Sequence, residues 1–107
     1  MQEEKQKILE QFQTYQQQLQ ALLFQKESLK MQKIEMERAL DELNACKQEF
    51  GYKIVGNVMI QKSIENLKSE LKESIDEINI RLKAIERSEN KIVEKLRELQ
   101  TKIGELK

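Results

Sequence analysis

The residues Phe50-Gly-Tyr-Lys-Ile-Val-Gly-Asn-Val-Met-Ile-Gln61 form the segment from which the architecture follows, because its periodicity differs from that of the rest of the chain. The segment is rich in β-branched and aromatic residues, and the dipeptide Gly56-Asn57 divides it into two equal runs. Glycine followed by asparagine at the two central positions is typical of a type II′ turn. We therefore predict a β-hairpin over about 51–62, with strands at about 51–55 and 58–62.

The two-residue turn also predicts how the strands pair and which side chains share a face. The expected partners are Val55 with Val58, Ile54 with Met59 and Lys53 with Ile60. An isolated hairpin is marginal in water and leaves both edges unpaired. One face could rest on neighbouring helix ends, but the other face and the edges need another partner. We expect an oligomer interface in which hairpins of several subunits close a sheet or barrel, formed by Tyr52, Ile54 and Met59 on one face and Val55, Val58 and Ile60 on the other.

The segments on either side of the hairpin have apolar residues at alternating steps of four and three, the heptad pattern of a coiled coil. We predict helices over about 3–49 and about 63–105, with Gly51 as the C-terminal cap of the first and Ser63 as the N-cap of the second. The step from Leu71 to Ile75 is four where three is due, which indicates a stutter. The first frame contains Ile8, Phe12, Tyr15, Leu19, Leu22, Leu29, Met36, Leu40, Leu43 and Phe50, and the second contains Ile75, Ile78, Leu82, Ile85, Ile92, Leu96, Leu99, Ile103 and Leu106.

The hairpin reverses the chain, so the two helices are expected to run antiparallel, each about 65–70 Å long. The predicted fold class is mainly α: a long antiparallel two-helix coiled coil, joined by a central β-hairpin that oligomerises into a β-barrel platform, as a single domain over residues 1–107. Two coiled-coil registers remain open. In both, Lys26 and Glu89 occupy adjacent layers, where they either pair or separately reach solvent.

The free end of a two-helix arm is expected to fray, because its core is so thin. The apolar side chains exposed there would be Ile8, Leu9, Phe12, Leu99, Ile103 and Leu106.

Composition excludes several functions. Charged residues make up 36% of the 107 residues, with 19 basic and 19 acidic side chains spread along the chain, so no basic patch is expected to bind nucleic acid. The apolar runs are too short for a membrane span. Histidine is absent and no phosphate-binding motif occurs, so we expect no enzyme, no cofactor and no metal site. The single Cys46 allows no internal disulfide and is read as inert, and a cytoplasmic protein is expected.

The hairpin residues Tyr52-Lys53-Ile54-Val55-Gly56-Asn57-Val58-Met59-Ile60, flanked by Leu40-Asp41-Glu42-Leu43 and Arg81-Leu82-Lys83-Ala84-Ile85-Glu86, resemble the β-type prefoldin subunit, especially its archaeal form. The resemblance implies a hexamer of two α-type and four β-type subunits whose hairpins form a double β-barrel platform. It further implies that the coiled-coil tips hold non-native client proteins without ATP and pass them to a group II chaperonin. On this chain, the platform role would fall to the six hairpin residues and the client contact to the six apolar residues of the tip.

A second hypothesis is an architectural coiled coil that tethers or spaces its partners and has no chaperone activity. It accounts for the heptads equally well. It does not account for a β-hairpin that is apolar on both faces.

Overall fold

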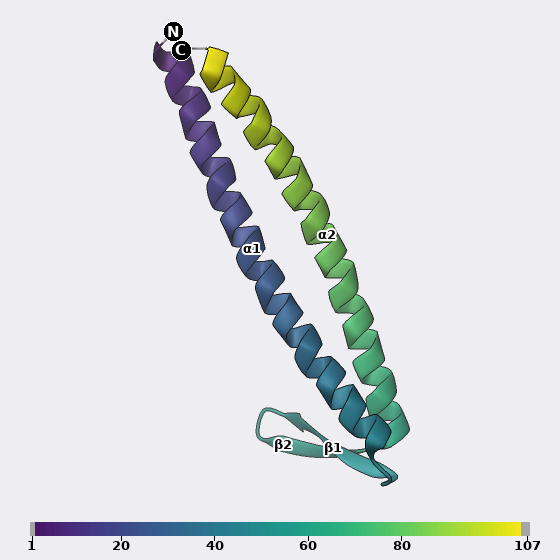
Figure 1. Cartoon of the computed structure of the whole chain (residues 1–107). Helices are drawn as coiled ribbons and strands as arrows, with labels where there is room; N and C mark the ends of the chain where they lie inside the picture. The colour runs from purple at the N-terminus through teal and green to yellow at the C-terminus, as the bar shows by residue number, and fades with distance from the viewer. Residues whose placement is uncertain (1, 106–107) are drawn as a thin grey trace. The chain divides into compact units, whose positions relative to one another are not determined.

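The computed structural model describes residues 2–105 and contains four elements, drawn in Figure 1. They are α1 (Gln2–Ala45), β1 (Phe50–Val55), β2 (Val58–Ser63) and α2 (Ile64–Glu105). The two strands form one antiparallel sheet. The predicted order of helix, strand, strand and helix is therefore confirmed.

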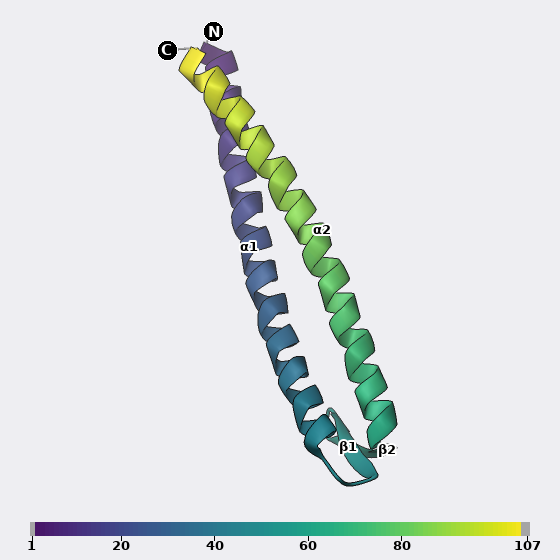
Figure 2. The same ribbon diagram turned by 45° about the vertical axis from the view of Figure 1, so that its right-hand side comes forward.

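The described residues fall into two compact units. The hairpin unit is Leu29–Arg81 and contains both strands, and the terminal unit combines residues 2–28 of α1 with residues 82–105 of α2. In each unit the two helical segments run side by side and antiparallel (Figure 1, Figure 2). The treatment of residues 1–107 as a single domain stays a prediction.

The hairpin has the predicted register and turn. Val55 pairs with Val58, Ile54 with Met59 and Lys53 with Ile60, and each strand extends one residue beyond its predicted outer end, to Phe50 and Ser63. Gly56 has a φ of 60°, and over residues 2–105 no other residue type adopts a positive φ. A type I′ turn would need a positive φ at Asn57 as well, so the turn is compatible with type II′ and not with type I′.

The first helix ends at Ala45, about four residues before the predicted boundary near residue 49. The N–H of Cys46 donates to the carbonyl of Leu43 at 3.3 Å, an i to i−3 bond that tightens the end of the helix. The N–H of Gln48 then donates to the Cys46 sulfur at 3.4 Å. These local bonds satisfy backbone donors at the helix end, and the chain then enters β1.

The predicted capping role of Gly51 is wrong, because this residue lies inside β1. A Cβ atom at Gly51 would meet Leu67 Cδ1 at 2.9 Å and Ile64 Cδ1 at 3.1 Å. The glycine is therefore used for close approach of β1 to α2 and not for a left-handed helix cap.

The start of α2 is capped as predicted. Ser63 Oγ accepts a hydrogen bond from the N–H of Asn66 at 3.1 Å, which satisfies one of the free donors of the first turn. The N–H of Ile64 donates to the carbonyl of Glu49 at 2.9 Å and closes the base of the hairpin. Strand β2 thus passes directly into α2.

The core is a thin seam, as expected for paired helices. No residue of α1 is fully buried, and its half-buried positions follow the heptad frame from Ile8 to Leu43. At the predicted stutter, the consecutive residues Ser74 and Ile75 are both half-buried, but Ile92 and Val93 are as well, so the stutter stays a prediction. Among residues 2–105, the buried residues all belong to α2 and are Ile64, Leu67, Ile78, Ile85 and Leu99.

Candidate assembly and client-contact surfaces

The six hairpin residues predicted to form an oligomer interface are all exposed. Their exposed fractions range from 40% for Ile60 to 71% for Ile54, and the neighbouring Phe50 is also exposed. Contiguous exposed apolar surface marks interaction sites in soluble proteins. The hairpin therefore has the surface that an assembly interface requires, while its contact with other subunits stays a prediction.

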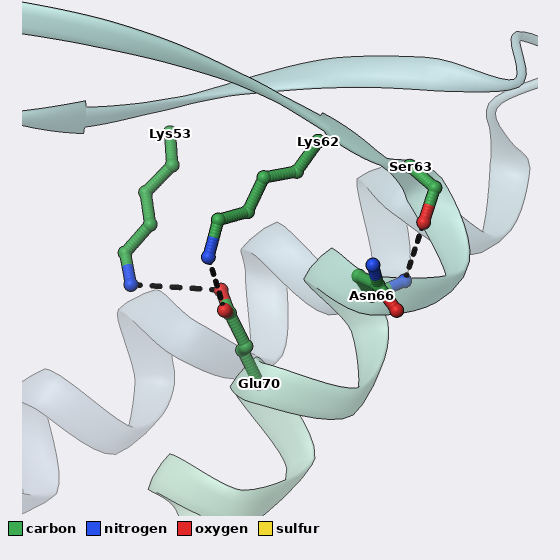
Figure 3. Close-up of polar contacts among 5 residues, drawn as sticks. All are labelled: Lys53, Lys62, Ser63, Asn66 and Glu70. Atoms are coloured by element: carbon green, nitrogen blue, oxygen red, sulfur yellow. Dashed lines mark hydrogen bonds and ion pairs between the residues drawn. The ribbon is translucent and has the colours of Figure 1, made fainter.

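One face of the hairpin is turned toward α2 (Figure 3). Lys53 from β1 and Lys62 from β2 extend from this face and meet at Glu70 of α2. Alternation along a strand places Val55, Val58 and Ile60 on the same face as these lysines and the other three interface residues on the opposite face. The second group is the more exposed of the two, since it faces away from α2: Tyr52 (61%), Ile54 (71%) and Met59 (63%).

The two lysines use different oxygens of the Glu70 carboxylate. Lys62 Nζ donates to Oε1, and Lys53 Nζ lies 3.5 Å from Oε2. The hydrogen bond from Lys62 is the main cause that lowers the pKa of Glu70 below its ordinary value, and the positive charges of both lysines act in the same direction. Partial desolvation opposes them. No local pattern in the sequence relates residues 53, 62 and 70, so this cluster was not predicted.

The terminal unit contains five described residues of the predicted client-contact set. Ile8, Phe12 and Ile103 are half-buried, Leu9 is exposed, and Leu99 is only 6% exposed. Leu106 lies outside the described residues. Client contact by this set stays a prediction, and Leu99 could take part only if the helix ends separate.

A partly buried ion pair joins the helices of the terminal unit. Lys26 Nζ lies 3.3 Å from Glu89 Oε1 and donates a 3.5 Å hydrogen bond to Oε2, and the two side chains are 20% and 17% exposed. Oε1 is itself buried and has the charge contact but no hydrogen bond. Of the two alternatives open from the sequence, pairing is the one observed.

Neither a metal cluster nor a membrane helix is found in the described part of the chain. Over residues 2–105, no three His, Cys, Asp or Glu side chains group so that they could hold a metal ion. Over the same residues, no helix is both long and apolar enough to cross a bilayer.

Two long helices joined by a β-hairpin with exposed apolar side chains on both faces define a class of helical-hairpin protein. The profile of the family described as "Prefoldin subunit" matches residues 6–107. The chain therefore belongs to the prefoldin subunit family.

Relatives of the β type support this assignment. The prefoldin subunit beta of Thermococcus kodakarensis is 38% identical over 99 residues, covering 92% of this chain and 85% of that protein. The prefoldin subunit beta of Archaeoglobus fulgidus is 35% identical over 102 residues, covering 94% and 88%. The crystal structure of the prefoldin beta subunit from Thermococcus strain KS-1 superposes with a TM-score of 0.88 at 36% identity, covering 96% of this chain and 91% of that one.

The resemblance to β-type prefoldin that the hairpin residues predicted is thus confirmed. Prefoldin subunits are non-enzymatic components of a chaperone. Family membership supports a chaperone role for this chain and its assembly with other prefoldin subunits.

Proposed function

We propose that this chain is the β-type subunit of an ATP-independent holdase that captures non-native proteins and passes them to a group II chaperonin. Its hairpin would assemble with α-type prefoldin subunits into a hexamer of two α-type and four β-type chains, with the hairpins forming the platform. The observation that carries this proposal is the exposure of apolar side chains on both faces of the hairpin.

The size of the exposed surface indicates how the hairpin would be used. Fully burying a large apolar side chain is worth about 1.5–3 kcal/mol, so the remaining exposure of the six interface residues represents about 5–10 kcal/mol per hairpin. Association costs a similar amount, about 4–15 kcal/mol. A contact that used only one face would therefore be weak, and stable assembly requires both faces and the free strand edges.

Client capture would use the terminal unit. Its apolar side chains are few and mostly half-buried, so each subunit would offer only weak contacts. Several such tips acting on one unfolded chain bind it through multivalency and still release it. We assign this role to Ile8, Leu9, Phe12, Leu99, Ile103 and Leu106.

The proposal is tested by mixing the purified chain with an α-type prefoldin subunit, then measuring native mass and the suppression of aggregation of a chemically denatured client. We expect a hexamer that suppresses aggregation. The double variant Phe12→Ser/Ile103→Ser should retain hexamer mass and lose much of this suppression. The control Gln11→Ser/Thr101→Ser alters exposed neighbours and should behave as wild type. Equal suppression by both double variants would refute the tip assignment.

The hairpin assignment is tested separately by Val58→Asp. A carboxylate at this position would be desolvated in a closed sheet, so we expect loss of the hexamer. The control Asn57→Asp adds the same charge at the adjacent turn residue and should leave assembly intact. An oligomer that tolerates Val58→Asp would instead favour the architectural tether. A cytoplasmic location stays a prediction from the sequence.

A further inference from the structure

The hairpin is held to α2 at two neighbouring places. At the first, Gly51 lies close to Ile64 and Leu67, where no side chain could be added without displacing them. At the second, Glu70 receives Lys53 and Lys62. Leu67 and Glu70 are three residues apart and therefore lie on adjoining turns of one face of the helix.

The two lysines come from different strands. Lys62 pairs across the hairpin with Gly51, and Lys53 pairs with Ile60, so the lysines are diagonal neighbours on one face. A carboxylate that held only one lysine would restrain one strand and leave the other strand held to α2 only at the base of the hairpin. Holding one lysine from each strand restricts rotation and tilt together.

Holding both lysines also fixes the direction in which the opposite face of the hairpin points. Because alternation along the strands places Tyr52, Ile54 and Met59 on the face opposite Lys53 and Lys62, the angle of the hairpin on the helix sets the direction in which they point. Hairpins that must meet in a closed sheet tolerate little variation in this angle. A hairpin fixed before association loses less conformational freedom when it assembles.

We propose that Glu70 is a positioning residue for assembly, which holds Lys53 and Lys62 so that the face of Tyr52, Ile54 and Met59 is presented to a neighbouring subunit at a set angle. This inference rests on the proposed function, since it assumes that the hairpin is the assembly surface. It assigns to Glu70 an effect on association without contact at the interface.

A simple surface ion pair is the competing explanation. The side chains of Glu70 and Lys53 are 38% and 47% exposed, and ion pairs of this exposure often contribute nothing measurable to stability. The two explanations differ in what they predict for hairpin orientation and for assembly. Global stability alone would not separate them.

The test uses the full chain in four forms: wild type, Glu70→Gln, the control Glu73→Gln and a triple variant that reverses the charges. The control removes the same charge one turn further along α2, from an exposed residue. For orientation, Cys46→Ser chains carry spin labels at Asn57→Cys and Lys72→Cys and are diluted with unlabelled chain. The distance distribution is then measured without an α-type subunit. For assembly, unlabelled chains are titrated with an α-type subunit at low salt and at about 1 M NaCl.

We expect Glu70→Gln to broaden the distance distribution and to raise the half-assembly concentration about three- to tenfold at low salt. The difference from wild type should shrink at high salt, because salt screens the ion pairs of Glu70 with Lys53 and Lys62 in wild type and the variant has none to lose. Glu73→Gln should match wild type throughout. Reversing all three charges with Lys53→Glu/Lys62→Glu/Glu70→Lys should narrow the distribution again and restore assembly toward wild type.

The inference is overturned if Glu70→Gln leaves the distance distribution unchanged. It is equally overturned if the distribution broadens and assembly stays at the wild-type concentration. In both cases wild-type assembly would still support the proposed function. A wild-type chain that fails to assemble with an α-type subunit would refute the proposed function, and this inference with it.

Discussion

Replacing Lys26 by leucine should destabilise the terminal unit, even though leucine is the better residue for a coiled-coil seam. The ammonium of Lys26 lies 3.3 Å from Glu89 Oε1, a distance at which two unit charges attract by about 5 kcal/mol at an effective dielectric constant of about 20. Desolvation of the two ions costs several kcal/mol each, so the intact pair contributes little net stability. Replacing only one of the two residues lowers stability strongly, because the other charge is then left partly buried without a partner.

The two single variants should differ in size. Lys26→Leu leaves the carboxylate of Glu89 with its Oε1 already shielded from solvent, and we expect a loss of about 2–3 kcal/mol in the free energy of unfolding. Glu89→Leu leaves a lysine, whose longer side chain can move its charge to water, and we expect a loss of about 1 kcal/mol. The double variant should be as stable as wild type or more stable, which gives a coupling of at least about 3 kcal/mol.

Urea unfolding followed by circular dichroism measures these free energies. All chains must be compared at one protein concentration, because association adds stability by mass action. Lys33→Leu is the matched control: Lys33 is a half-buried seam lysine without an ion pair among the described residues. It should stabilise the chain, since it leaves no carboxylate behind.

Additive effects would refute this reasoning. If the double variant lost the sum of the two single losses, Lys26 and Glu89 would act independently, each reaching solvent on its own. A Lys26→Leu chain as stable as the Lys33→Leu chain would lead to the same conclusion.

Three further outcomes follow from the hairpin unit. Gly51→Val should lower the free energy of unfolding in urea by about 1–3 kcal/mol, because the added methyl groups collide with Leu67. Gly51→Ala should lower it less. A Val variant as stable as wild type would contradict the close packing. Ser63→Ala should lower the free energy of unfolding by about 1 kcal/mol, because the hydrogen bond that Asn66 N–H donates to the cap is lost. Ser63→Asp should preserve stability, since a carboxylate can accept the same bond. Equal losses in the two variants would show that the loss does not come from the cap. Because the pKa of Glu70 is lowered, its ion pairs with Lys53 and Lys62 should be intact at any pH above the ordinary glutamate pKa of 4.5. These ion pairs should be lost only in stronger acid, as the pH falls through the lowered pKa of Glu70. The spin-label distances should therefore stay narrow from neutral pH down to about 5 and broaden in stronger acid, and broadening near neutrality would contradict this assignment.

Much of the fold was accessible from residue spacing. The heptad frame predicted which positions of α1 become half-buried, including the charged Lys26. Gly56-Asn57 predicted the turn and, through it, every cross-strand pair that was named. The resemblance of the hairpin residues to β-type prefoldin then led to the family that the comparisons confirm.

Other features were missed or misassigned. Gly51 suggested a helix cap, but its lack of a side chain instead allows β1 to lie close to Leu67. The end of α1 at Ala45 also went unrecognised, because the apolar spacing continues beyond it to Phe50. The Glu70 cluster had no signal in the sequence, where its lysines look like ordinary solvated charges.

The sequence pattern alone was sufficient to predict the two helices, the hairpin register and the two apolar hairpin faces. Periodicity and turn chemistry act between residues that are close in sequence, so they can be recognised without the fold. The folded arrangement was needed to establish which hairpin face turns toward α2, that Lys26 meets Glu89, and that Glu70 holds both strands. Each of these depends on how separate helices and strands pack against one another, which the spacing of residues within one element does not determine.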